Sequence, residues 1–139
     1  MAEASANGTD ARIVEMLREA IPGLIAAYRF GSAGTEHARA GSDVDLAFLS
    51  DREQTPLDVW DLAQRVAMVL GRDVDLVDLA RASTVMAAQV IAKGRLLVET
   101  DTARREMFEA HALSDYARLN EERREILEDI RRRGSIHGR

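Results

Sequence analysis

The chain has 139 residues, a formal net charge of −5 and no cysteine, and this length fits one domain with a single core. Its 46% hydrophobic and 31% charged residues are typical of a globular protein, its negative charge argues against broad nucleic-acid binding, and the lack of cysteine excludes disulfides and Cys-ligated metals. No apolar run approaches the ~20 residues of a membrane-spanning helix, so we expect a cytoplasmic protein without membrane contact.

The first third of the chain predicts one helix and two strands. Apolar residues recur at helical spacing from Asp10 to Ala20, and Thr9 or Asp10 can cap this helix. The apolar segment "LIAAYRF" (residues 24–30) predicts a buried strand. The segment "DVDLAFL" (residues 43–49) alternates aspartate with apolar residues and then becomes fully apolar, which favours a strand that begins at the end of a sheet.

The middle of the chain carries strong helix boundary signals. Thr55 followed by Pro56 predicts the start of a helix that stops at Gly71. The helical spacing of Trp60 with neighbouring apolar residues favours a core position for the indole. The segments that follow predict a strand at 73–79, a helix at 84–93 and a strand at 95–99.

The last part of the chain, residues 101–133, is rich in Glu and Arg and predicts a long helix. We expect a break near Ser114 and Asp115, because both residue types favour helix ends over helix interiors. The order of elements predicts an α/β fold with one small mixed β-sheet, packed helices and a C-terminal helical extension. The expected division is a flexible lead (1–9), a compact domain (10–99), the helical extension (100–133) and a disordered tail (134–139).

Two carboxylates stand at the start of the second predicted strand. Asp43 and Asp45 are two residues apart. In a strand, residues at this spacing point to the same face and lie about 6.5–7 Å apart at the backbone. Like charges this close repel, and a divalent cation removes the repulsion. Mg²⁺ prefers carboxylate oxygens and shares its shell with substrate phosphates. The pair therefore indicates a metal site for phosphoryl or nucleotidyl transfer.

A Gly-Ser pair directly follows the first predicted strand. Gly31 has no side chain, so backbone N–H groups near it can approach phosphate oxygens closely. The Ser32 hydroxyl adds one more donor. One loop thus offers phosphate donors and the next strand offers metal ligands, and a nucleoside triphosphate bound to Mg²⁺ needs both.

A third carboxylate of a two-metal site is available in "DVDLVDL" (residues 73–79). By alternation Asp73 and Asp75 share one face of the strand and Asp78 lies on the other, so periodicity alone does not choose between Asp75 and Asp78. Asp75 is favoured because it lies early in the strand and has valine and leucine as its neighbours, as Asp45 does.

Gly31-Ser32, ten residues, and then Asp43-Val44-Asp45 form a pattern that resembles the G-S-x10-D-x-D signature of the DNA polymerase β-like nucleotidyltransferases. The short chain and the "VDLVDL" strand resemble the minimal nucleotidyltransferase subgroup, and within it the MntA-type antitoxins of HEPN/MNT toxin–antitoxin pairs. The motif region covers residues 24–79, and the resemblance of the whole domain covers about 10–98.

This resemblance implies an enzyme that uses Mg²⁺, with two ions expected, and ATP. Members of this type transfer AMP to a tyrosine of a cognate HEPN ribonuclease toxin, which silences the toxin. By position, Asp43 and Asp45 would hold the metals, Asp75 would be the third carboxylate that helps to activate the acceptor hydroxyl, and Gly31 and Ser32 would hold the triphosphate. Larger relatives carry a further domain for base or acceptor recognition, so the choice of acceptor in this short chain is expected to come from the surface of a partner protein.

Two other functions are compatible with these residues. An enzyme of the same fold could transfer a nucleotide to a small-molecule hydroxyl. A non-catalytic antitoxin could instead neutralise its toxin by contact alone. Labelling of a protein acceptor, labelling of a small molecule, or neutralisation without labelling distinguishes the three.

Overall fold

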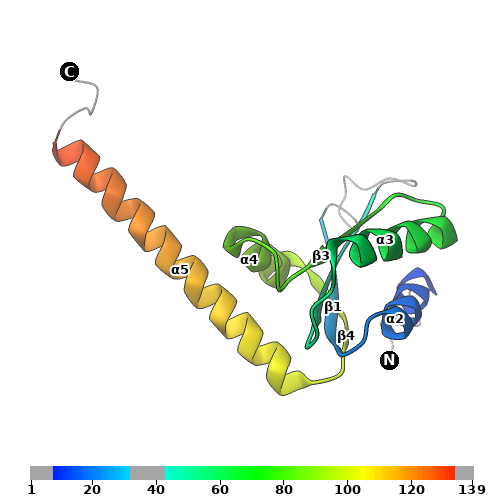
Figure 1. Cartoon of the computed structure of the whole chain (residues 1–139). Helices are drawn as coiled ribbons and strands as arrows, with labels where there is room; N and C mark the ends of the chain where they lie inside the picture. Colours follow the sequence, from blue (N-terminus) through cyan, green and yellow to red (C-terminus); the bar gives the residue numbers. More distant parts are fainter. Residues whose placement is uncertain (1–7, 32–42, 134–139) are drawn as a thin grey trace.

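The computed structural model of the chain describes residues 8–31 and 43–133. Figure 1 shows a sheet with helices on both sides and one long helix that extends away from it. The elements in chain order are α2 (Gly8–Ala20), β1 (Leu24–Phe30), β2 (Val44–Ser50), α3 (Pro56–Leu70), β3 (Val74–Asp78), α4 (Thr84–Lys93), β4 (Arg95–Glu99) and α5 (Thr102–Arg132).

The sheet has four strands in the order β3-β2-β1-β4. β1 pairs antiparallel with β2 and with β4, whereas β2 and β3 pair in parallel. A parallel pair needs a long crossover connection, and α3 supplies it between β2 and β3. The predicted small mixed sheet with packed helices and a C-terminal helical extension is confirmed.

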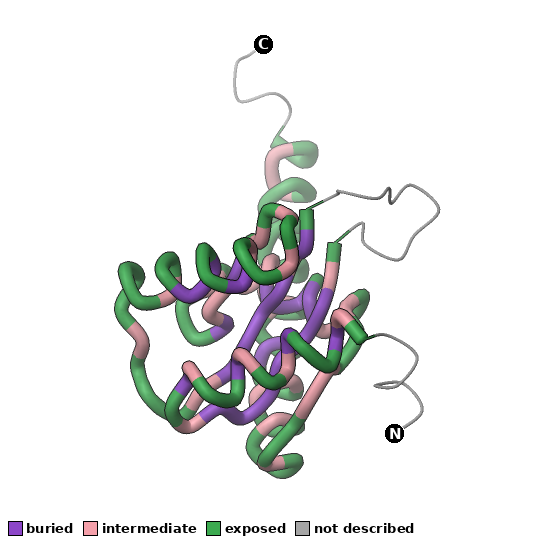
Figure 2. Tube along the Cα trace, turned by 90° about the vertical axis from the view of Figure 1, so that its right-hand side faces the viewer, coloured by how far each residue is buried: buried purple, intermediate pink, exposed green. Residues whose placement is uncertain are grey.

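Each face of the sheet has its own apolar core, as the buried segments in Figure 2 indicate. Alternation along β2 divides its side chains between the two cores: Val44, Leu46 and Phe48 pack with α2 and α3, whereas Ala47 and Leu49 pack with α4 and α5. Both faces are therefore covered by helices, and the site residues lie at one end of the strands.

Most element boundaries follow local signals in the sequence. The Thr55 side chain caps α3 by accepting a hydrogen bond from the backbone N–H of Asp58, and Gly71 ends that helix in the left-handed conformation with φ 70°. The strand at 24–30, the helix at 84–93 and the strand at 95–99 begin and end where predicted.

The predicted cap of the first helix is wrong. α2 begins at Gly8, so Thr9 and Asp10 lie within its first turn rather than before it. Asp10 is buried, with 4% of its surface exposed, and its carboxylate pairs with Arg29 of β1 instead of serving as the helix cap. A buried charge requires such a partner, and this requirement outweighs the local preference for a cap position.

The predicted break in the last helix is also wrong, because α5 is continuous over 31 residues, or about 46 Å at 1.5 Å per residue. No proline or glycine occurs between Thr102 and Arg132. Asp115 is accommodated in the helix by an ion pair with Arg118 one turn later, at 2.7 Å.

A polar network fixes the first half of α5 to the sheet. The Tyr28 hydroxyl of β1 donates to Glu109 at 2.6 Å, and Arg105 donates to Glu99 of β4 at 2.6 Å and to Glu109 at 2.9 Å. Burial, followed by the hydrogen bond to Glu109, raises the pKa of Tyr28 above its ordinary value. Ala112 is the single buried residue of α5. Beyond it the helix extends away from the sheet, as Figure 1 shows. Residues 113–132 are called the projecting half of α5.

Two terminal predictions fall mostly outside the described residues. The flexible lead is described only from Gly8, which is helical, and the tail at 134–139 is not described. Across residues 8–31 and 43–133, none of the helices combines the length and the apolar character needed to cross a bilayer.

Candidate active site at the ends of three strands

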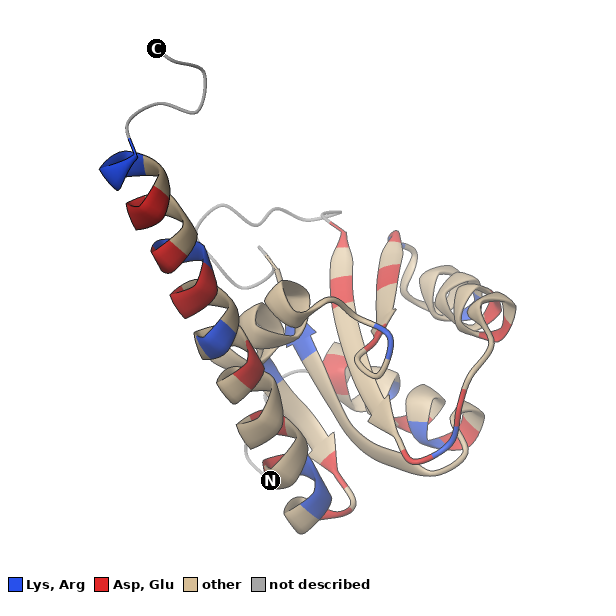
Figure 3. Cartoon of the chain, turned by 60° about the vertical axis from the view of Figure 1, so that its left-hand side comes forward, with Lys and Arg blue, Asp and Glu red and all other residues tan. Residues whose placement is uncertain are grey.

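Two of the predicted site carboxylates lie side by side. β2 and β3 run in parallel with Asp45 in register with Asp75, so the two side chains share one face of the sheet. Asp43 directly precedes β2, and Phe30 at the end of β1 pairs with Asp45. Figure 3 shows acidic residues gathered at neighbouring ends of two strands.

Gly31 brings the turn after β1 against one of these carboxylates. Its φ is +84°, which L side chains rarely adopt. A Cβ atom on Gly31 would lie 2.0 Å from Oδ2 of Asp45, far inside van der Waals contact. Two independent constraints therefore require glycine here. Ser32, the other predicted phosphate-binding residue, lies outside the described residues.

Repulsion among the carboxylates contributes to a raised pKa of Asp45. Burial raises the pKa of Asp45, the charges of Asp75 and Asp43 raise it further, and the charge of Arg29 opposes them. An ionised Asp45 is thus held in an environment that disfavours its own charge. A bound cation would relieve this cost, and the donor set consists of the hard oxygen atoms that Mg²⁺ prefers.

The three carboxylates are close enough to interact, yet they do not converge as a finished metal site. Within the part of the chain that the structure describes, no three acidic or histidine side chains are arranged to hold one ion. Ionised carboxylates repel one another, so an open arrangement of Asp43, Asp45 and Asp75 fits their charge state. The donor chemistry therefore fits Mg²⁺, while their joint coordination of it stays a prediction.

An ion-pair cluster behind the site was not foreseen from the sequence. Arg29, 9% exposed, donates to Asp10 at 2.9 Å, and Arg95 of β4 donates to the other oxygen of Asp10 at 2.5 Å. Arg29 lies in β1 one residue before Phe30, the partner of Asp45. The sequence signal was a single arginine inside an otherwise apolar strand, because a buried guanidinium requires a carboxylate partner.

The structure separates the two candidates for the third carboxylate. Asp78 is in register with Phe48 near the other end of the shared strand pair. Its Oδ1 accepts a hydrogen bond from the backbone N–H of Ala80 at 3.1 Å, and Arg81 lies 3.8 Å from its Oδ2. Asp78 therefore closes a turn, whereas Asp75 stands beside Asp45.

Trp60 is not a core residue, and that prediction is wrong. The indole is 59% exposed, because the buried face of α3 is formed by Leu62, Ala63 and Val66. Gln64 lies one helical turn after Trp60 and is exposed. This polar residue indicates that the same side of the helix faces solvent.

Trp60 borders a groove of about 510 Å³ between α3 and β3. The wall from α3 is largely apolar, and the other wall runs along β3 to the turn that follows it. The lining residues are Pro56, Val59, Trp60, Ala63, Gln64, Val74, Asp75, Leu76, Val77, Asp78, Arg81 and Ala82. Asp75 thus belongs both to the carboxylate group and to the groove.

Comparison with known proteins gives a consistent result. The family model "Polymerase beta, Nucleotidyltransferase" matches residues 11–103. The protein adenylyltransferase MntA of Shewanella oneidensis is 40% identical over 121 residues, which cover 86% of this chain and 85% of that protein.

Solved structures agree with this match. A complex of tri-AMPylated Shewanella oneidensis HEPN toxin with MNT antitoxin contains a chain that is 38% identical, with a TM-score of 0.75 and coverage of 88% of this chain and 95% of that one. A toxin–antitoxin structure with AMP-PNP contains a chain that is also 38% identical, with a TM-score of 0.78 and coverage of 87% and 97%.

Proposed function

Because this chain belongs to the polymerase β nucleotidyltransferase family, we propose that it is an antitoxin with protein adenylyltransferase activity. It transfers AMP from ATP to a tyrosine of a HEPN ribonuclease toxin and thereby silences the toxin. The observation that carries the proposal is the pairing of Asp45 with Asp75 at the strand ends, in a chain whose adenylyltransferase relative matches over 86% of its length.

Each site residue has a defined role in this proposal. Asp43 and Asp45, with Asp75, would hold Mg²⁺, which when bound neutralises the phosphates and the leaving group. Gly31 leaves room for the carboxylate of Asp45, since a Cβ atom there would lie 2.0 Å from its Oδ2, and its bare backbone would let a triphosphate approach closely. Ser32 would donate its hydroxyl to a phosphate oxygen.

The reaction is a single displacement at phosphorus. The tyrosine oxygen forms a bond to the α-phosphorus while the bond from that phosphorus to the bridging oxygen breaks, and pyrophosphate leaves with the electron pair. Asp75 takes the phenolic proton, for which its position beside Asp45 is suited. Arg29, held by Asp10, limits the rise in the pKa of Asp45 and so favours its ionised form.

The proposal also assigns the parts of the chain. Residues 10–99 form the minimal nucleotidyltransferase domain, and residues 100–133 form an extension whose first half docks on the sheet. We also propose that this activity takes place in the cytoplasm, where ATP is supplied.

The test uses ATP labelled in its α-phosphate. The chain is incubated with labelled ATP, Mg²⁺ and its proposed HEPN partner, and we expect label on a tyrosine of that protein. Replacing both Asp43 and Asp45 by asparagine should abolish labelling without unfolding the chain. Asp61→Asn is the matched control, because Asp61 is an exposed carboxylate of α3 that pairs only with Arg65 among the ion pairs of the described residues.

Three outcomes separate the alternatives. Label on a small molecule and on no protein would identify a small-molecule nucleotidyltransferase. Full neutralisation of the toxin by the doubly substituted variant would identify an antitoxin that acts by contact. Neither label nor neutralisation with the intact protein would overturn both antitoxin functions.

A further inference from the structure

We propose that the groove between α3 and β3 binds an extended segment of the acceptor protein, which adds to the free edge of β3 and brings its hydroxyl side chain to Asp75. The inference rests on the proposed function, because it assigns the binding site of the protein acceptor. Three features of the groove lead to it: the strand edge, the apolar wall and the charges.

The outer edge of β3 offers unpaired backbone groups. β3 is the end strand of the sheet, and no other described strand pairs with its outer side. The backbone N–H of Val44 bonds to the carbonyl of Asp73 and that of Leu79 bonds to the carbonyl of Phe48, both at 2.9 Å. Because these bonds place residues 73 and 79 toward β2, alternation turns the N–H and C=O groups of Val74 and Leu76 outward.

Backbone N–H and C=O groups that face outward into a groove can form hydrogen bonds with the main chain of a bound polypeptide. An extended segment that adds to a strand edge gains main-chain hydrogen bonds, and alternate side chains enter pockets on either side. The span of β3 that lines the groove runs from Val74 to Asp78. A segment added here passes Asp75, so a side chain at that register lies next to the carboxylate pair.

The wall opposite the strand is apolar and carries an exposed aromatic side chain. Pro56, Val59, Trp60 and Ala63 contribute to it, and the indole of Trp60 is 59% exposed. A tryptophan at a groove is the type of residue that dominates the energy of protein interfaces once it is covered. The wall therefore fits aliphatic or aromatic side chains of the added segment.

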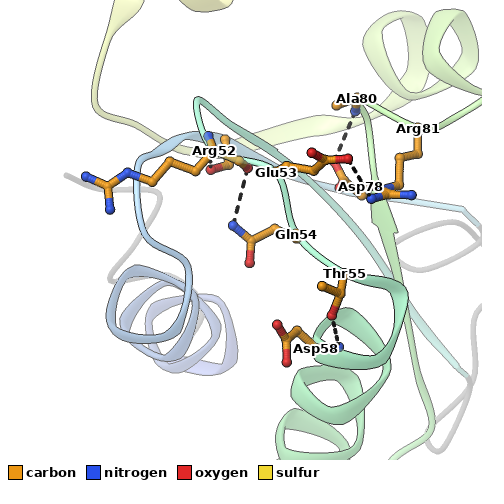
Figure 4. Close-up of polar contacts among 9 residues, drawn as sticks. Arg52, Glu53, Gln54, Thr55, Asp58, Asp78, Ala80 and Arg81 are labelled. Atoms are coloured by element: carbon orange, nitrogen blue, oxygen red, sulfur yellow. Dashed lines mark hydrogen bonds and ion pairs between the residues drawn. The ribbon is translucent and has the colours of Figure 1, made fainter.

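The charges of the groove favour a neutral or basic occupant. Asp75 and Asp78 both line the groove and make it acidic. Arg81 is the basic residue among the lining residues, and its guanidinium lies 3.1 Å from Glu53 and 3.8 Å from Asp78. Figure 4 draws the three side chains. Because the positive charge of Arg81 is already paired, the acidic groove fits a neutral or basic peptide.

The test compares the Michaelis constants for the two substrates. Trp60→Ala should raise KM for the HEPN acceptor by about 10-fold or more, because a covered tryptophan anchor is lost, while KM for ATP stays within about twofold. Trp60→Phe should restore much of the affinity. Met68→Ala is the matched control, because Met68 is an 84% exposed apolar residue of the same helix outside the groove.

A second variant probes the strand edge itself. Proline is tolerated at the first residue of an edge strand when its nitrogen faces outward, so Val74→Pro removes one outward N–H with little effect on the sheet. We expect it to raise KM for the acceptor several-fold above that of Val74→Ala, which loses the side chain alone. Both variants should retain the wild-type KM for ATP.

Trp60 is the single tryptophan of the chain, so its fluorescence reports directly on the groove. Adding a tryptophan-free peptide that contains the acceptor tyrosine should shift the emission of Trp60 to shorter wavelength. An unchanged emission and an unchanged acceptor KM in Trp60→Ala would overturn the inference, as would a rise in KM for ATP alone. A wild-type protein that labels no protein acceptor would instead refute the proposed function.

Discussion

Replacing Asp45 by asparagine is expected to stabilise the metal-free protein while it abolishes AMP transfer. Asp45 is partly buried beside Asp75 and near Asp43, and these surroundings raise its pKa. The folded state therefore disfavours the ionised carboxylate relative to the unfolded chain. Asparagine has nearly the same shape and carries no charge, so the repulsion disappears while the packing stays.

The spacing of the strands sets the size of this effect. Neighbouring strands lie about 4.8 Å apart, and Asp45 and Asp75 are in register. Two unit charges at this distance repel by about 0.9 kcal/mol in bulk water and about 3.5 kcal/mol at an effective dielectric constant of 20. Asp75 is exposed, so we expect a gain near the lower figure, about 1 kcal/mol, which corresponds to a rise in Tm of about 2–5 °C.

Thermal unfolding in chelator measures this difference, with Asp61→Asn as the control for the loss of one negative charge. Because the pKa of Asp45 is raised, the wild type has its full stability below the ordinary carboxyl pKa and loses it as the pH rises through the raised value. The two proteins should therefore converge at low pH and separate at neutral pH. Added Mg²⁺ should raise the Tm of the wild type more than that of the variant. An Asp45→Asn protein that is less stable than the wild type in chelator at neutral pH would refute this reasoning.

Three further expectations concern the turn, the buried ion pair and the last helix. Gly31→Ala places a side chain in a left-handed conformation and against Asp45, so kcat for AMP transfer should fall by at least about 10-fold at saturating ATP; an unchanged kcat would contradict the geometry. Asp10→Ala leaves the buried guanidinium of Arg29 without its carboxylate and should lower the free energy of unfolding in urea by about 3–5 kcal/mol. Arg95→Ala removes a side chain that is 52% exposed and should lower it by less than about 1 kcal/mol; equal losses would argue against a buried pair. The projecting half of α5 should exchange its amide hydrogens much faster than the docked half, because it contains no buried residue; equal protection in the isolated chain would contradict this arrangement.

Local signals explain why much of the fold was predictable from the sequence. Thr55 and Gly71 bound α3 through a side-chain cap and a left-handed glycine, and both act within one helical turn. The strand at residues 24–30 is apolar apart from Arg29 and buried apart from Phe30, so its pattern clearly indicates a buried strand. The prediction that Asp43 and Asp45 share one face rests on the period of a strand, but Asp43 lies one residue before β2, so the shared face stays a prediction.

The features that escaped prediction depend on residues far apart in the chain. Asp10 pairs with Arg29 across 19 positions, and no local pattern reveals which carboxylate a strand arginine will meet. Trp60 is exposed because Leu62, Ala63 and Val66 already form the buried face of α3, and that choice of face depends on where the sheet lies. Both features depend on how the helices pack on the sheet, which the periodicity of the sequence does not reveal.

The most direct test of the account is to map AMP groups on the HEPN partner by mass spectrometry after incubation with ATP and Mg²⁺. The account predicts AMP on a tyrosine of the partner with the wild-type chain, loss of ribonuclease activity in step with that modification, and neither effect with the variant in which Asp43 and Asp45 are both asparagine. An unmodified partner whose ribonuclease activity persists in the presence of the wild-type chain and ATP would contradict it.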